Sequence, residues 1–129
     1  MDKLFEMVDL YIEKFFERRL FQNIIFREMA MNQRTAMAEK ITVQVHKNFL
    51  LAYDIIQTGI DNKEFKKVDI ELTVMSIIGI VRMYTTSGTM ACKILKVEDE
   101  SEAFGKKQKD RLRKHLRQLL INHLGIESK

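Results

Sequence analysis

The sequence predicts an all-α protein, a single helical domain of about five helices, and three observations lead to this prediction. The 129 residues include no proline and only five glycines, so the chain lacks the turn residues that all-β domains require. Its 46% hydrophobic and 31% charged residues suit a folded domain rather than a disordered chain. Apolar residues also recur at intervals of three or four through most of the chain, which is the period of an amphipathic helix.

Two helices are predicted near the N-terminus. Residues 3–18 carry an apolar stripe, with acidic residues on the opposite face of the same helix. A shorter apolar helix follows over about residues 20–29, and the polar residues 31–35 predict a break after it.

The third predicted helix covers residues 36–61 and has the most regular apolar stripe of the chain. We expect it to end near Asp61 and Asn62, because Asn readily adopts the left-handed conformation found at helix C-termini. Asp69 then has the character of an N-cap for the next helix.

The predicted helix over residues 70–95 is apolar around nearly its whole circumference. Such a helix in a soluble protein must be buried on more than one side, and a domain of about five helices has difficulty covering it. We therefore expect this helix to pack against a second copy of the chain. The small residues Ser76 and Gly79 would allow another helix to approach closely.

An acidic loop over residues 96–101 precedes the last predicted helix, 102–124, and Asp99 with Glu102 forms the pattern of a capping box. The last helix carries a leucine stripe, and its other faces are basic. Residues 103–129 hold eight Lys or Arg against two acidic residues, whereas the first 102 hold 14 against 16. This charge distribution raises the possibility of nucleic-acid binding through residues 106–117. That segment lacks interleaved aromatic residues for stacking, so a face that is solvated or faces a partner's acidic residues is the favoured interpretation.

No pattern in the sequence indicates an enzyme, a metal site or a cofactor. None of the three histidines has a Glu three residues before it, and a single cysteine, Cys92, cannot form a thiolate zinc site. We interpret Cys92 as a small apolar residue in the interior or at an interface. The chain also has no signal-peptide pattern and no uninterrupted 18-residue apolar stretch, so we expect a cytoplasmic protein without a membrane span.

Several residues allow either a structural or a ligand-binding interpretation. Arg82 interrupts the apolar helix, so it forms an ion pair inside the domain or across a dimer, or it anchors a polar group of a ligand. His46 and Tyr53 lie beside the apolar stripe of the third helix, as boundary residues or as the polar groups of a cavity. Four more residues belong either to the core or to a cavity wall: Tyr11, Phe15, Met29 and Phe49.

Over residues 2–124 the sequence resembles the effector half of TetR-like transcriptional regulators. The resemblance is carried by Leu4-x3-Val8-x2-Tyr11-Ile12, by Leu20-x3-Ile24-Ile25-x-Arg27-Glu28-Met29, by residues 59–72, by Ile77-Ile78-Gly79 and by the Leu-rich last helix. Three positions depart from the family pattern. Arg18-Arg19 stands where the family commonly has Asn-Pro, Lys63 where it often has Gly, and Ile70 where it often has Pro.

The resemblance implies that residues 1–129 form a ligand-binding and dimerisation domain. An unknown small-molecule effector would occupy an apolar cavity and control DNA binding by an N-terminal helix-turn-helix domain that this sequence lacks. Candidate ligand-binding residues are Tyr11, Phe15, Met29, His46, Phe49, Tyr53, Ile78 and Arg82. The last two long helices would form a four-helix bundle with those of a second copy, through Ser76, Gly79, Met83, Leu112, Leu116, Leu119 and Leu120. The alternative function is a structural dimer or adaptor whose basic C-terminal helix binds an acidic partner.

Overall fold

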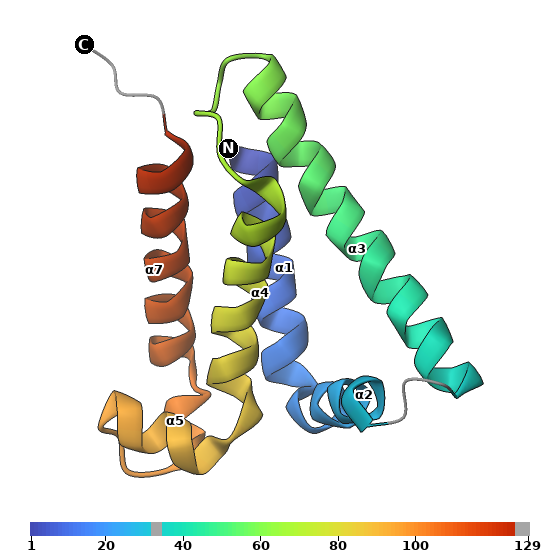
Figure 1. The fold of residues 1–129 in the computed structure, drawn as a ribbon. Coiled ribbons are helices and arrows are strands. Elements are labelled where there is room, and N and C mark those ends of the chain that lie inside the picture. Colours follow the sequence, from blue (N-terminus) through green and yellow to red (C-terminus); the bar gives the residue numbers. More distant parts are fainter. Residues whose placement is uncertain (32–34, 126–129) are drawn as a thin grey trace.

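The computed structural model describes residues 1–31 and 35–125, and these residues form seven helices (Figure 1). The helices are α1 (Asp2–Glu17), α2 (Arg19–Met31), α3 (Ala36–Asp61), α4 (Ile70–Thr86), α5 (Gly88–Leu95), α6 (Glu100–Ala103) and α7 (Lys106–Leu124). The predicted all-α class is confirmed. The prediction of about five helices is too low, because two predicted helices are each interrupted. Among the described residues, no helix is long and apolar enough to cross a membrane.

Helix α1 occupies the centre of the molecule and contacts α2, α3, α4 and α7 (Figure 1). Its buried residues are Leu4, Val8, Ile12 and Phe15, spaced three or four apart so that they form one stripe. The stripe packs with the buried side of α7, which consists of Leu112, Leu116, Leu120 and Leu124. Each fully buried side chain of this size contributes about 1.5–3 kcal/mol.

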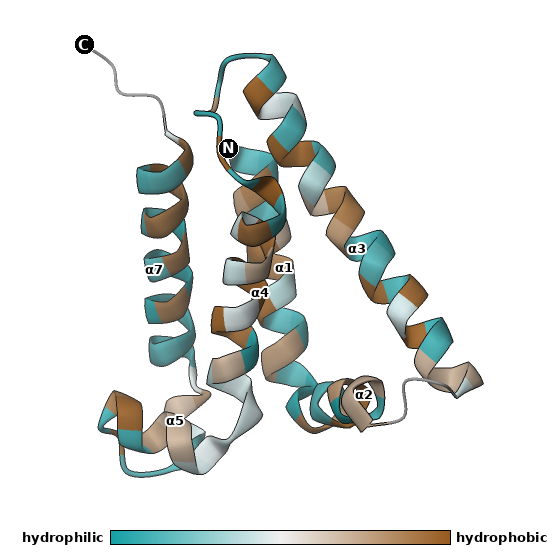
Figure 2. Cartoon of the chain, viewed as in Figure 1, coloured by the Kyte–Doolittle hydropathy of each residue, from teal (hydrophilic) through white to brown (hydrophobic). Residues whose placement is uncertain are grey.

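Helix α7 carries its basic residues partly toward α1 rather than only toward solvent. Glu13 accepts from Lys109 Nζ at 3.0 Å and lies 3.2 Å from Arg113 Nη2. Asp9 lies 2.6 Å from Arg117 Nη2 and 3.0 Å from Arg113 Nε, the latter without the alignment of a hydrogen bond. Part of the basic face therefore pairs inside the chain, which corrects the expectation of a face that is solvated or partner-facing throughout. Figure 2 shows that the side of α7 facing α1 and α4 is hydrophobic and the opposite side hydrophilic.

The predicted helix 70–95 is divided at Ser87 into α4 and α5. Ser87 has an extended backbone, with φ −139° and ψ 118°, and its hydroxyl accepts a hydrogen bond from Met90 N at 3.3 Å. A serine with this geometry caps a new helix and cannot continue the preceding one. Gly88 follows it in contact with the Glu100 side chain, at a place where a Cβ would overlap the carboxylate. Residues 85–89 interrupt the apolar pattern at this corner and include a Ser-Gly pair typical of a turn, a signal that the prediction of one continuous helix passed over.

The predicted helix 102–124 is also divided. Asp99 Oδ1 accepts from Glu102 N at 3.0 Å, which confirms the capping interaction. The capped helix α6 ends after one turn, and α7 begins beyond Gly105, whose backbone is extended with φ −80° and ψ 172°. The hydroxyl of Tyr84 donates to the carbonyl of Ala103 at 2.5 Å and ties α6 to α4.

The α3–α4 connection differs from its prediction in one detail. Asn62 has φ −83°, and the left-handed residue is Lys63, with φ 60°. The position at which the family pattern often has glycine is therefore the one that needs positive φ. Asp69 caps α4 as predicted, and its Oδ1 accepts from Leu72 N at 3.0 Å.

Helix α3 is anchored near its two ends. Its buried residues are Ala38 at the start and Ala52, Ile56 and Gly59 toward the end, and none of residues 39–51 is buried. The helix runs diagonally from α2 to α1 and α4, and its first half stands apart from these two helices (Figure 1). This arrangement leaves one side of α1 and α4 accessible beside the middle of α3.

Candidate small-molecule cavity

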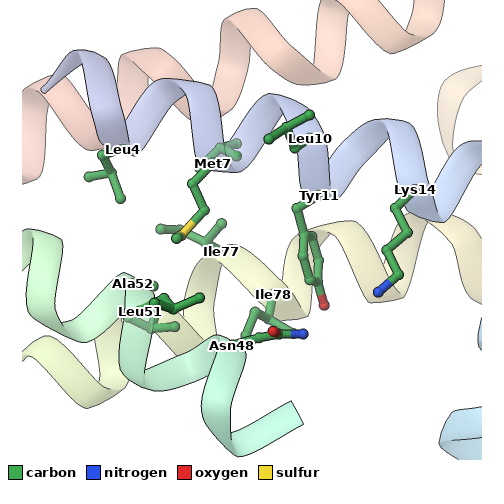
Figure 3. Close-up of a pocket in the computed structure, with 12 residues that line it drawn as sticks. Leu4, Met7, Leu10, Tyr11, Lys14, Asn48, Leu51, Ala52, Ile77 and Ile78 are labelled. Carbon is green, nitrogen blue, oxygen red and sulfur yellow. The ribbon is translucent and has the colours of Figure 1, made fainter. Parts of the chain in front are cut away.

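A cavity of about 210 Å³ lies between α1, α3 and α4 (Figure 3). Its walls are mainly apolar. They include Met7 and Leu10 of α1, Leu51 and Ala52 of α3, and Ile77 and Ile78 of α4. The α1 residues reach the cavity because positions 4, 7, 8, 11 and 14 share one helical face. An apolar cavity with a few polar groups is the usual form of a small-molecule site.

The polar groups of the cavity gather at one end. Tyr11 and Lys14 extend there from α1, and the Asn48 amide lies opposite them on α3 (Figure 3). Among the described residues, no hydrogen bond forms with the Tyr11 hydroxyl and no ion pair with the Lys14 ammonium. Asn48 Oδ1 accepts from Gln44 Nε2 at 3.4 Å, and no acceptor among the described residues takes its amide hydrogens. Three donors without a protein acceptor among the described residues therefore gather at this end, with Lys14 and Asn48 exposed at the rim of the cavity and Tyr11 half-buried.

Tyr11 is held in place by its ring and remains a hydrogen-bond donor. The ring stacks on that of Phe15, with centroids 4.4 Å apart. Burial raises the pKa of the Tyr11 phenol far above its usual value, and the positive charge of Arg82 offsets only part of this rise. The phenol is thus protonated at neutral pH and has a proton to donate.

The positive charge of Arg82 is close enough to Tyr11 to interact with its phenol. No carboxylate of the described residues forms an ion pair with Arg82. Its Nη1 donates to Asn23 Oδ1 at 2.5 Å, and its guanidinium lies 4.7 Å from the centroid of the Phe26 ring. Asn23 in turn donates to the carbonyls of Thr85 and Thr86, each at 3.3 Å. Burial lowers the pKa of Arg82, and the interaction with Tyr11 opposes this shift. Among the described residues, Arg82 is therefore held by the Asn23 amide and the Phe26 ring, and not by the intramolecular ion pair that the sequence analysis considered.

The structure brings two of the eight candidate ligand residues to this cavity, Tyr11 and Ile78. Phe15 is 2% exposed and belongs to the core beside Tyr11 and Phe26. Arg82 acts on the cavity through Tyr11 rather than by lining it.

The other four candidates lie away from the cavity walls. His46, Phe49 and Tyr53 follow one another along α3, with ring centroids 6.2 Å and 6.3 Å apart. His46 is exposed, and the other two are half-buried. Met29 is half-buried on α2.

Sequence reasoning missed the two polar residues Lys14 and Asn48. Lys14 follows Tyr11 by three positions and so shares its helical face, which was the available signal. Leu10 and Leu51 were missed because they lie outside the main apolar stripes, and an apolar residue at such a position is a signal for a cavity or an interface.

The candidate dimer residues fall into two groups. The first group is exposed along the outer side of α4 and consists of Ser76, Gly79 and Met83. A groove between α4 and α7 lies on the same face, and Leu119 of α7, which is 42% exposed, lines it. A second groove extends this face from Gly79 and Met83 to Ile94 of α5. The remaining three residues are at most 6% exposed and pack inside a single chain: Leu112, Leu116 and Leu120.

The described residues contain no group of three or more His, Cys, Asp or Glu side chains placed to hold a metal ion. Cys92, interpreted as a small apolar residue of the interior or of an interface, is half-buried on α5. Comparisons of the chain with protein-family models, with curated proteins and with solved structures find no match.

Proposed function

We propose that this chain is the effector-sensing and dimerisation domain of a cytoplasmic TetR-like transcriptional regulator. The observation that carries the proposal is the cavity between α1, α3 and α4, with apolar walls and three donors at one end. A small molecule bound there would control DNA binding by a helix-turn-helix domain outside residues 1–129.

The outer face of α4 supports the dimerisation part of the proposal. Leu72, Met75 and Met83 are 58–60% exposed on one side of this helix, and Gly79 between them has open space around the position of a Cβ. A contiguous apolar face of this kind is typical of a protein-protein interface. In the proposed dimer, α4 and the Leu119 edge of α7 meet their counterparts in a second copy.

Helix α4 offers a physical connection between the two sites. Ile78 lines the cavity, and the next residue, Gly79, lines a groove on the outer face. A ligand that binds better to one position of α4 would favour the dimer geometry compatible with that position. The size of the response is limited by the difference between the ligand's affinities for the two geometries.

The adaptor alternative receives less support from α7. Lys109, Arg113 and Arg117 already pair with Asp9 and Glu13 inside the chain, which leaves a smaller basic surface for an acidic partner. We therefore retain the sensing domain as the proposed function.

The test is native mass spectrometry of the purified chain, followed by a reporter assay. We expect a dimer, and a copurified small molecule would appear as additional mass. For the reporter, the chain is fused to a helix-turn-helix head that binds its operator only as a dimer, and we expect operator occupancy. A monomeric chain and an inactive fusion would contradict the proposal.

A further inference from the structure

We propose that the cavity between α1, α3 and α4 selects a small amphipathic monocarboxylate, with its apolar body between the helices and its carboxylate at Lys14, Asn48 and Tyr11. The inference deepens the proposed function and depends on it, because it requires the cavity to be the ligand site. It adds the chemical class of the ligand and the residues that distinguish this class.

The apolar part of the ligand follows from the walls. Leu10, Leu51 and Ile78 line the cavity with hydrocarbon, with Leu10 and Leu51 at its open rim, and no acidic side chain lines it. An apolar body gains free energy by leaving water for such surroundings. The volume of about 210 Å³ is below the roughly 300–1,000 Å³ of pockets for drug-sized ligands, so the body must be small.

The charged part follows from the donors at the other end. A phenol hydroxyl, an ammonium and an amide NH2 converge there, and none has an acceptor among the described residues (Figure 3). An ionised carboxylate only accepts hydrogen bonds, and its two oxygens have sites for all three donors. A cationic head would find no carboxylate on the cavity wall to pair with.

The charges around this end also favour an anion. Asp9 and Glu13, the nearest acidic residues earlier on α1, face α7 and pair with its basic residues. Glu17 is one turn beyond Lys14 and forms no ion pair with it. Arg82 adds a second positive charge behind Tyr11. The donor end of the cavity is therefore positive, and a ligand that brings a negative charge meets attraction there.

A carboxylate fits the donors better than a phosphate does. The strongest protein partner of a phosphate is a guanidinium that binds two oxygens at once. The guanidinium of Arg82, whose charge acts on Tyr11, is already engaged with Asn23 and stacked on Phe26. One ammonium with two neutral donors matches a single negative charge.

The experiment compares octanoate with 1-octanol, which has the same apolar chain and a neutral head. Binding of each to the full chain is measured by titration calorimetry, below the concentration at which octanoate forms micelles. Nuclear magnetic resonance of the Ile77 and Ile78 methyl groups locates the bound probe. We expect octanoate to bind at least about tenfold more tightly than octanol, as for hydrogen bonds to a charged group.

Two variants test whether Lys14 causes the preference for octanoate over octanol. Lys14→Gln removes one exposed charge, so we expect the chain to remain folded, the affinity for octanol to stay unchanged and the preference for octanoate to fall to about threefold or less. Lys3→Gln is the matched control. It removes the same charge from α1 about 16 Å closer to the N-terminus, away from the donor end of the cavity. It should therefore preserve the preference for octanoate.

The outcomes separate this inference from the proposed function. Equal affinities for octanoate and octanol would overturn the anionic class, and an unchanged preference in Lys14→Gln would overturn the placement of the carboxylate at Lys14; both results would leave the cavity as a ligand site. Binding of neither probe would overturn both.

Discussion

Arg117 of α7 and Asp9 of α1 form a direct ion pair, with Arg117 Nη2 2.6 Å from Asp9 Oδ2. Arg113 approaches the other oxygen of the same carboxylate to 3.0 Å. One acidic residue thus contacts two arginines and connects the first helix of the chain with the last. The leucine stripe of α7 meets the stripe of α1 just beneath these pairs.

Replacing Asp9 by asparagine should therefore destabilise the fold. Both pairs are partly exposed, with Asp9 at 26% and Arg117 at 43% side-chain exposure, so each contributes modestly. We expect the free energy of unfolding to fall by about 1–2 kcal/mol in total, measured by urea denaturation. Glu6→Gln is the control, since Glu6 is an exposed α1 residue without an ion pair among the described residues. An equal effect of both substitutions would contradict the prediction.

Two glycine-to-alanine substitutions should have opposite effects on stability. A Cβ at Gly59 would overlap the ring of Phe65, which is itself buried, so we expect a loss of about 1–3 kcal/mol from overpacking. A Cβ at Gly79 meets nothing within 4 Å, so the better helix propensity of alanine should stabilise the single chain by up to about 1 kcal/mol. Urea denaturation of the two variants, at equal and low protein concentration, measures both effects. A stable Gly59→Ala variant would contradict the close packing of Phe65.

The substitution Met83→Glu tests the outer face of α4 as the dimer interface. Met83 is 59% exposed, so a charge there should leave the single chain folded but oppose burial against a second copy. We expect the dimer dissociation constant, measured by sedimentation equilibrium, to rise at least about a hundredfold. Met37→Glu is the matched control, because Met37 is a similarly exposed methionine on α3. Unchanged association of Met83→Glu would move the interface to another surface.

Tyr84 should make the fold sensitive to high pH. Burial raises the pKa of Tyr84 from 10.0 to about 12, while Arg111 opposes this shift and Cys92 adds to it. Because the folded state holds this proton more tightly than the unfolded state does, the stabilisation is complete below pH 10 and is lost as the pH rises from 10 to about 12.

The measurement is the unfolding free energy of wild type and Tyr84→Phe across this pH range. The variant lacks the hydrogen bond to the Ala103 carbonyl, so it should be less stable at neutral pH and should lose less stability above pH 10. Parallel stability curves for the two proteins would show that Tyr84 does not contribute to the pH dependence.

The sequence predicted the long helices because their stability depends on periodic apolar stripes that can be counted. The bounds of α3 agree with the predicted 36–61, and Asp69 caps α4 as expected. The failures occurred at two short polar interruptions, residues 85–89 and the residues around Gly105, where the chain changes direction. Ser87 and Gly105 are the two cases, and in both the deciding interactions come from residues that periodicity does not weigh.

The cavity was less predictable than the fold. Tyr11 was identified on the apolar stripe of the first predicted helix and Ile78 on the apolar helix 70–95, but Lys14 and Asn48 look like ordinary surface residues of their helices. Their role depends on the angle between α1 and α3, which no local pattern encodes. For the same reason the sequence did not indicate that Leu112, Leu116 and Leu120 would be covered within one chain.

Helix α3 has its buried residues at Ala38 and at Ala52, Ile56 and Gly59, so a small rotation at its C-terminal part produces a larger displacement of its N-terminus. From Ile56 to Ala38 it extends about 27 Å, and none of residues 39–51 is fully buried. A tilt of about 5° around Ile56 would move Ala38, and the end of α2 beside it, by about 2.4 Å. A change in cavity width too small to disturb the core would thus become a displacement the size of a side chain at the far end of the molecule.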